Sequence, residues 1–163
     1  MYFRFYFASG QSLFGGGGAS RSFEGRGRVY DAGVTSDAPL PPVLVADDEE
    51  QLLRLCGRVL GKRGYEVLSA RSGDEAIRIF AGRREDIRAV VIDATISPKG
   101  AAPVLDKISK MRDDVGVVFT GGDELDAPLR ELLLANEGIF LRKPFPAIAL
   151  VHAVEDSQMR EVP

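Results

Sequence analysis

Short apolar runs and amphipathic stretches alternate along the chain from residue 42 onward. The runs are rich in β-branched and aromatic residues, which is typical of buried strands, and they cover residues 43–46, 65–69, 89–92, 115–119 and 139–141. The stretches between them have apolar residues at helical spacing, over residues 50–61, 74–81, 104–111, 125–135 and 146–154. This alternation predicts an α/β fold, in which helices cover both faces of a parallel sheet.

Local signals at the ends of the predicted helices support this pattern. Ser72 and Glu75 have the spacing of a capping box, in which the serine hydroxyl accepts a backbone N–H and the glutamate reaches back to the cap. Gly64 and Gly138 stand where two helices are expected to end. Because crossovers between parallel strands are right-handed, all the strands should end at one edge of the sheet, where such folds place their sites.

The first 41 residues differ in composition from the rest of the chain. Residues 1–42 hold 8 of the 18 glycines and 8 of the 13 Phe and Tyr residues, and Gly15 to Gly18 form an unbroken run. Glycine runs are costly to order, so we expect residues 1–41 to be a largely disordered extension. A docking segment is the alternative, because residues 1–7 have the composition of a strand. The folded domain is expected at 42–155, followed by a tail at 156–163.

Charge and cysteine content exclude several classes of protein. A net charge of −3 and an isoelectric point near 5.3 argue against nucleic-acid binding, which needs a basic surface. The single cysteine, Cys56, excludes an internal disulfide framework and favours a reducing cytoplasm. No apolar run approaches the roughly 18 residues of a membrane span, so we expect no membrane partner.

Polar residues follow the predicted strands at the edge where the site is expected. They are Asp47, Asp48 and Glu49 after the first strand, Asp93 after the third, Thr120 after the fourth, and Lys143 and Pro144 after the fifth. Acids that converge need a cation between them, and oxygen ligands at such a site suit Mg²⁺. Together with the lysine and the threonine hydroxyl, they predict an aspartate nucleophile, Asp93, that attacks phosphorus.

Each of these residues, taken alone, also has a structural explanation. Acidic residues are favourable at a helix N-terminus, which would account for Asp47 and Asp48. An aspartate at the end of a strand, such as Asp93, often caps a turn. The functional interpretation therefore depends on the joint placement of the whole set at successive strand ends.

The set of motifs resembles the receiver domain of the two-component response-regulator family. The matching segments are, in order, VLVADDEE, AVVIDATISP, VVFTGG and IFLRKPF, and the resemblance covers about residues 42–155. It implies a flavodoxin-like, doubly wound sheet of five strands in the order 2-1-3-4-5. It also implies that Asp93 is the phospho-acceptor, that Asp48 and Asp93 bind Mg²⁺ directly, and that Asp47 binds it through water. The backbone carbonyl of Thr95 would be a further metal ligand.

The resemblance assigns further roles around the pocket. Thr120 and Lys143 would contact the phosphoryl group, and the bond between Lys143 and Pro144 is expected to be cis. Phe140 occupies the family's aromatic switch position, where ordinary core packing is the alternative role. Because phenylalanine has no hydroxyl, we expect switching by burial alone, with Thr120 as the coupled hydroxyl.

One loop departs from the family pattern. Family members usually have proline four residues after the acceptor and glycine eight after it, whereas this chain has Ser97 and Ala101 there, with Pro98 and Gly100 adjacent. The loop therefore has a changed register. This change affects the expected placement of the Thr95 carbonyl, and hence metal affinity and phosphoryl lifetime.

The resemblance implies a function in phosphorelay signalling. Asp93 would take a phosphoryl group from a sensor histidine kinase or a histidine phosphotransfer protein. The output would be a protein contact on the face formed by the fourth helix, fifth strand and fifth helix, without enzymatic turnover of a substrate. Alternatives are a pseudo-receiver that only docks a partner, and a severed tail of a hybrid histidine kinase, whose C-terminal receivers have a similar Thr-Gly-Gly texture.

Two enzymatic or cofactor-binding alternatives fit less well. A phosphohydrolase with an aspartyl nucleophile would want an acid two residues after Asp93, and that position is Thr95. A flavodoxin-like FMN protein would need a phosphate loop after the first strand, where the acids of this chain would repel the phosphate.

Overall fold

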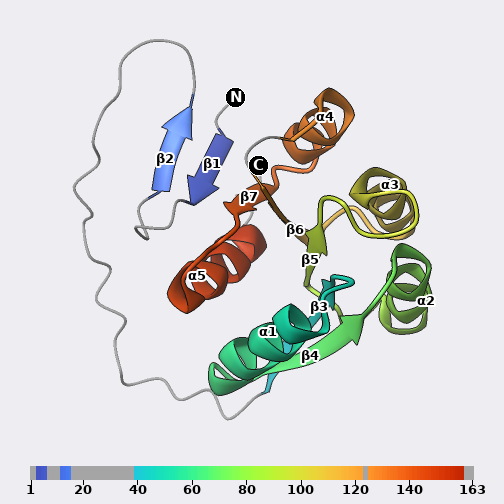
Figure 1. The fold of residues 1–163 in the computed structure, drawn as a ribbon. Coiled ribbons are helices and arrows are strands. Elements are labelled where there is room, and N and C mark those ends of the chain that lie inside the picture. Colours follow the sequence, from blue (N-terminus) through green and yellow to red (C-terminus); the bar gives the residue numbers. More distant parts are fainter. Residues whose placement is uncertain (1–2, 7–11, 16–38, 123–124, 160–163) are drawn as a thin grey trace.

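A computed structural model of the chain describes residues 3–6, 12–15, 39–122 and 125–159. Five parallel strands form the body of its sheet: β3 (Leu40–Ala46), β4 (Tyr65–Ala70), β5 (Ala89–Asp93), β6 (Gly116–Gly121) and β7 (Ile139–Arg142). Their order across the sheet is β4-β3-β5-β6-β7 (Figure 1). This is the predicted order 2-1-3-4-5, and the predicted α/β fold is confirmed.

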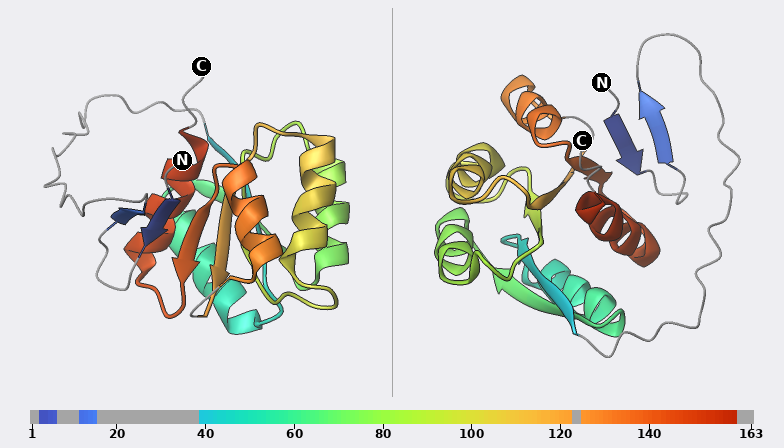
Figure 2. Two further views of the ribbon diagram at one scale, coloured as in Figure 1. Left: turned by 90° about the horizontal axis from the view of Figure 1, so that it is seen from above. Right: turned by 180° about the vertical axis from the view of Figure 1, so that it is seen from behind.

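Helices cover both faces of the sheet (Figure 2). One face carries α1 (Glu50–Lys62) and α5 (Ala147–Gln158), and the other carries α2 (Gly73–Arg83), α3 (Ala101–Met111) and α4 (Ala127–Ala135). The expected strand and helix boundaries differ from these by up to three or four residues. Because β3 begins at Leu40 and α5 ends at Gln158, the folded elements extend slightly beyond 42–155 at both ends. No helix among the described residues is both long and apolar enough to cross a membrane.

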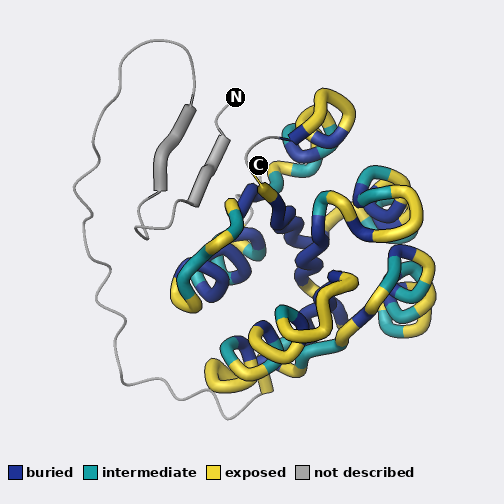
Figure 3. The backbone as a smooth tube through the Cα atoms, in the orientation of Figure 1, coloured by how far each residue is buried: buried dark blue, intermediate teal, exposed yellow. Residues whose placement is uncertain are grey.

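Strands β5 and β6 are buried along their whole length (Figure 3), and alternate residues of the sheet belong to two separate core clusters. In β5, Val90 and Ile92 pack with α2, α3 and α4, whereas Ala89 and Val91 pack with α1 and α5. Side chains of a strand point alternately to opposite faces, so a continuous apolar run is what a strand between two helical layers requires. Strand β4, at the edge of the sheet, departs from this pattern, because Glu66 and Ser69 are exposed.

The helix-end signals are partly as predicted. The Ser72 hydroxyl accepts a hydrogen bond from the Glu75 N–H at 3.2 Å, but the Glu75 carboxylate accepts from the N–H of Arg71, one residue before the expected donor. Gly64 has φ of 98° and ends α1 as expected. At the end of α4 the left-handed residue is Glu137, with φ of 50°, and not Gly138. A Cβ on Gly138 would lie 2.6 Å from Leu133 Cδ1 and 3.2 Å from the Val117 carbonyl oxygen, so a larger residue there would require its neighbours to shift.

Two further strands come from the N-terminal extension. Strand β1 (Phe3–Tyr6) pairs in parallel with β7, and β2 (Ser12–Gly15) pairs antiparallel with β1, so the described sheet has seven strands. Residues 7–11 and 16–38 lie outside the described part of the chain.

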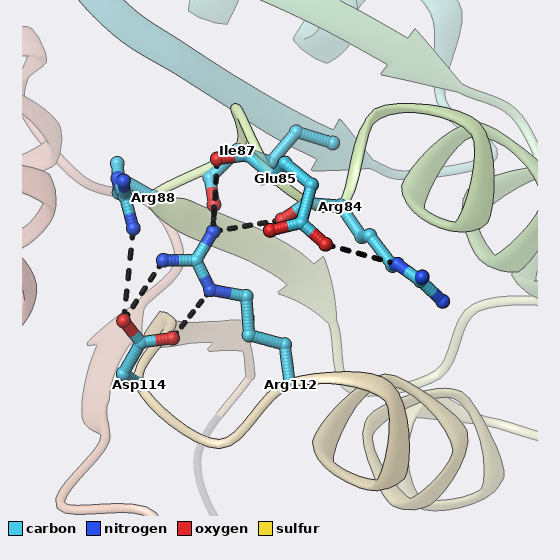
Figure 4. A network of polar contacts seen from close by, with 6 residues as sticks. All are labelled: Arg84, Glu85, Ile87, Arg88, Arg112 and Asp114. Carbon is cyan, nitrogen blue, oxygen red and sulfur yellow. Dashed lines mark hydrogen bonds and ion pairs between the residues drawn. The ribbon is translucent and has the colours of Figure 1, made fainter.

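Arg112, at the end of α3, ties two connections together at the edge of the sheet opposite the predicted site (Figure 4). Its guanidinium donates to the carbonyls of Arg84 at 2.7 Å and Glu85 at 3.1 Å, beyond the end of α2. It also forms an ion pair with Asp114 in the loop before β6. The connections before β5 and β6 are thus held by one side chain.

Candidate functional site

The predicted site residues lie where β3, β5, β6 and β7 end. Asp47 directly follows β3, Asp93 is the last residue of β5, and Lys143 directly follows β7. Thr120 lies opposite Asp93 in the pairing of β5 with β6. The parallel order therefore brings residues from positions 47 to 143 of the chain to one edge, as the sequence predicted.

Lys143 joins two buried carboxylates. Its Nζ donates to Asp47 Oδ2 and to Asp93 Oδ1, at 2.8 Å each. Asp47 is 2% exposed and Asp93 is 4% exposed. Burying two carboxylates costs free energy unless cations or donors satisfy them, so the ammonium is what holds this pair inside the protein.

The pKa of Lys143 reflects this environment. Burial lowers the pKa of the ammonium, but the hydrogen bonds to Asp47 and Asp93 and the charges of both carboxylates outweigh burial, so its pKa is raised above its usual value. The lysine is therefore fully charged at neutral pH. A single positive charge between two negative ones leaves the buried cluster with a net negative charge.

Backbone geometry fixes the carboxylate of Asp47. Its Oδ1 accepts the N–H of Glu49 at 2.8 Å, in the turn that leads into α1. Its own N–H donates to the carbonyl of Ala70 at the end of β4. Asp47 is thus held by two neighbouring elements, while its second oxygen faces Lys143.

Asp48 is placed differently from the other two acids. It is exposed, and its Oδ2 accepts a hydrogen bond from the Ser97 hydroxyl at 3.3 Å. Within the described ranges, no group of three His, Cys, Asp or Glu residues is gathered closely enough to hold a metal ion. In this structure Asp47 and Asp93 therefore contact Lys143, whereas Asp48 contacts Ser97.

The loop after β5 supplies a contact that sequence reasoning missed. Thr95 was expected to contribute only its backbone carbonyl, but its hydroxyl donates to Asp93 Oδ2 at 2.7 Å and its N–H donates to the same oxygen at 3.0 Å. The signal available in the sequence was a hydroxyl residue two positions after the acceptor. The bond between Ser97 and Pro98 is cis, as is that between Lys143 and Pro144.

Thr120 and Phe140 are both buried. Thr120 is 2% exposed, and its carbonyl accepts the N–H of Ala94 at 2.7 Å, which links β6 to the loop after Asp93. Phe140 is 3% exposed and belongs to the core cluster that includes Leu129 and Leu133 of α4. A Cβ built on Gly121, next to Thr120, would lie 3.4 Å from the Phe140 ring. Phe140 lies opposite Phe119 in the sheet register and its ring is packed inward, whereas Thr120 lies opposite Leu141.

Comparisons with known proteins agree with this geometry. The family model described as "Response regulator receiver domain" matches residues 43–155. The transcriptional regulatory protein PrrA of Mycobacterium bovis is 34% identical over 126 residues, which are 77% of this chain and 51% of that protein. The sensor kinase CckA of Brucella abortus is 31% identical over 114 residues, which are 70% of this chain and 12% of that protein.

A solved structure is similar over the same region. A response regulator receiver domain protein from Clostridium thermocellum has 30% identity and a TM-score of 0.63, with 73% of this chain and 94% of that one covered. The chain spans about half the length of PrrA and a much smaller part of CckA, so the likeness concerns one domain of each. This chain belongs to the response regulator receiver domain family.

Proposed function

We propose that this chain accepts a phosphoryl group on Asp93 from a phosphohistidine of a sensor histidine kinase or a histidine phosphotransfer protein, in the cytoplasm. The observation that carries the proposal is the pair of buried carboxylates, Asp47 and Asp93, held by the Nζ of Lys143 at 2.8 Å each. Stability alone does not explain a buried ion pair, because apolar side chains of similar size at such positions often stabilise a protein as well or better.

The transfer is a displacement at phosphorus by a carboxylate oxygen of Asp93. The O–P bond forms as the N–P bond of the donor breaks, and the imidazole nitrogen keeps the electron pair. Lys143 already touches Asp93 Oδ1, so its ammonium is positioned to bind an oxygen of the arriving group. Thr120, opposite Asp93 on β6, supplies a hydroxyl on the neighbouring strand. The chain would act as an acceptor and not as an enzyme that turns over a substrate.

The donor set fits Mg²⁺. Asp47, Asp48 and Asp93 carry three negative charges against the one of Lys143, and this excess favours a hard divalent cation with oxygen ligands. Asp48 and Asp93 would hold the ion directly, Asp47 would hold it through water, and the Thr95 carbonyl would be a further ligand. When bound, Mg²⁺ would neutralise charge that builds up on the phosphoryl oxygens.

The output of the domain is proposed to be a protein contact on the face formed by α4, β7 and α5. Phe140 of β7 is packed with α4 in this structure, so a change in its burial would alter that face. The chain matches only part of PrrA and of CckA. We therefore also propose that it can serve as the receiver part of a larger protein, such as a hybrid histidine kinase.

The test is phosphoryl uptake from acetyl phosphate with Mg²⁺, followed by intact mass or radiolabel. We expect the wild-type chain to gain one alkali-labile, hydroxylamine-sensitive phosphoryl group, and the Asp93→Asn variant to gain none. Asp106→Asn is the matched control, because Asp106 is an exposed carboxylate on α3 that pairs with Lys110, and it should label normally. Labelling of the Asp93→Asn variant at the wild-type level would exclude the proposal.

One observation favours a second function, a pseudo-receiver that docks a partner without phosphorylation. In the described residues the hydroxyls of Thr95 and Ser97 bind Asp93 and Asp48, and no three-carboxylate metal group is formed. Under this alternative the wild-type chain would neither label nor bind Mg²⁺ with beryllofluoride. The labelling experiment therefore separates the two functions.

A further inference from the structure

Two hydroxyl groups from one loop lie on the two acids that are proposed to hold the metal directly. The Thr95 hydroxyl donates to Asp93 Oδ2 at 2.7 Å, and the Ser97 hydroxyl donates to Asp48 Oδ2 at 3.3 Å. Both residues are exposed, so neither hydroxyl is placed there by burial in the core. Their position follows from the backbone of the loop that connects β5 to α3.

The loop backbone is held at both ends. The carbonyl of Asp93 accepts the N–H of Ile96 at 3.1 Å, and the carbonyl of Ala94 accepts the N–H of Ala101 at 3.1 Å. Gly100 takes φ of 76°, a conformation that glycine adopts without strain, and thereby lets the chain enter α3. In the middle of the loop the Ser97 carbonyl accepts the N–H of Gly73 at the start of α2. The two hydroxyls are therefore presented by an anchored loop.

The donors around Asp93 leave little free capacity on its carboxylate. A carboxylate has about four lone-pair positions, and here Lys143 occupies one on Oδ1 while the Thr95 N–H and hydroxyl occupy two on Oδ2. The phosphoryl acceptor must use one oxygen of Asp93 for phosphorus and the other for the cation. At least one of the present donors must then leave.

We infer that the Thr95 hydroxyl, with a smaller contribution from Ser97, competes with Mg²⁺ for the carboxylates of Asp93 and Asp48 and so weakens metal binding in this receiver. The proposal rests on the proposed function, because it concerns the same pocket. Thr95 acts as a positioning residue: it holds Asp93 in the metal-free state and must release it when the pocket is loaded. The Thr95 N–H remains as a donor in both states.

The test is Mg²⁺ affinity, measured by titration calorimetry on the unphosphorylated full chain. Thr95→Val keeps the shape of the side chain and removes the hydroxyl, whereas Thr95→Ser keeps the hydroxyl and serves as the control. We expect Thr95→Val to bind Mg²⁺ about fivefold more tightly than wild type, as loss of one competing hydrogen bond predicts, and Thr95→Ser to bind like wild type. Ser97→Ala should give a smaller gain, because its hydrogen bond is longer and exposed.

A second readout separates competition from a general structural effect. The rise in melting temperature on adding saturating Mg²⁺ should be larger for Thr95→Val than for wild type, while the metal-free variant should be no more stable than wild type. Equal or weaker Mg²⁺ binding by Thr95→Val, when wild type binds Mg²⁺ and takes up label, would overturn this inference alone. If wild type binds no Mg²⁺ and takes up no label, the result would contradict both the proposed function and this inference.

Discussion

Lys143 determines the charge balance of the pocket, and its charge also affects the pKa of Cys56 in α1. It is the ammonium that pairs with both Asp47 and Asp93. Cys56 of α1 lies within the field of this pair. Burial raises the pKa of the Cys56 thiol to about 12, the charge of Asp47 adds to this shift, and the charge of Lys143 opposes it. The Cys56 side chain is 1% exposed and packs in the core between α1, α5 and the sheet.

The raised pKa of Cys56 predicts a pH dependence of stability. A group whose pKa is higher in the folded than in the unfolded state contributes stability that is complete below the unfolded value, about 8.5, and declines as pH rises toward 12. Between pH 7 and pH 10 the thiol ionises in the unfolded state but not in the folded state, which should lower the free energy of unfolding by about 2 kcal/mol. Urea unfolding at both pH values measures this loss.

The matched variant for this measurement is Cys56→Ala. It loses packing at every pH, but its stability should fall less steeply between pH 7 and pH 10 than that of wild type. The remaining slope would come from other groups, such as Tyr65, whose pKa is also raised, mainly by burial. Rapid alkylation of native Cys56 by iodoacetamide at neutral pH would contradict the buried, protonated thiol.

At the scale of elements, two loops make contacts that the apolar periodicity of the sequence did not predict. The loop after β5 orients Thr95 and Ser97 toward the site, and Arg112 holds the connections at the opposite edge (Figure 4). Ser97 and Arg112 contact residues that are distant in sequence, whereas Thr95 contacts Asp93 two residues away. Arg112, for example, reaches carbonyls 25 to 28 residues away.

Replacement of Arg112 tests how strongly these connections are coupled. Arg112→Met removes the donors to the carbonyls of Arg84 and Glu85 while keeping a long side chain, so we expect it to lower the free energy of unfolding by about 1–2 kcal/mol. Arg88→Met is the control, because the Arg88 side chain forms an exposed ion pair with Asp114 at 3.6 Å and should lose at most about 0.5 kcal/mol. Equal losses in urea unfolding would argue against the coupling.

At the scale of the whole molecule, the described sheet has seven strands, whereas the apolar pattern from residue 42 onward predicted five. The residues of β1 already have the composition of a strand, but a strand needs a sheet, and nothing local identifies the edge of β7 as its partner. The register pairs Phe5 with Phe140, so the extension meets the strand that carries the proposed switch residue. An open edge on β7 would otherwise expose unpaired backbone groups to other chains.

Removal of residues 1–38 should expose this edge. We expect faster hydrogen exchange at those amides of residues 139–142 that point toward β1, because successive amides of a strand point to opposite neighbours. Amides of β7 that point toward β6, and those of β5, serve as internal controls and should keep their protection. Unchanged exchange throughout β7 would show that β1 does not protect this edge in solution.

The sequence by itself determined the five-stranded parallel fold, the strand order through its family resemblance, and the strand ends at which Asp47, Asp93, Thr120 and Lys143 stand. The fold and the strand ends follow from apolar periodicity and from the rule that parallel strands end at one edge, whereas the strand order rests on the family resemblance. Only the tertiary structure decided that Lys143 bridges Asp47 and Asp93, that Thr95 and Ser97 engage the acids, and that β1 joins β7. The Lys143 bridge, the Ser97 contact and the pairing of β1 with β7 depend on distances across the fold, and the Thr95 contact depends on the backbone path of the loop after β5.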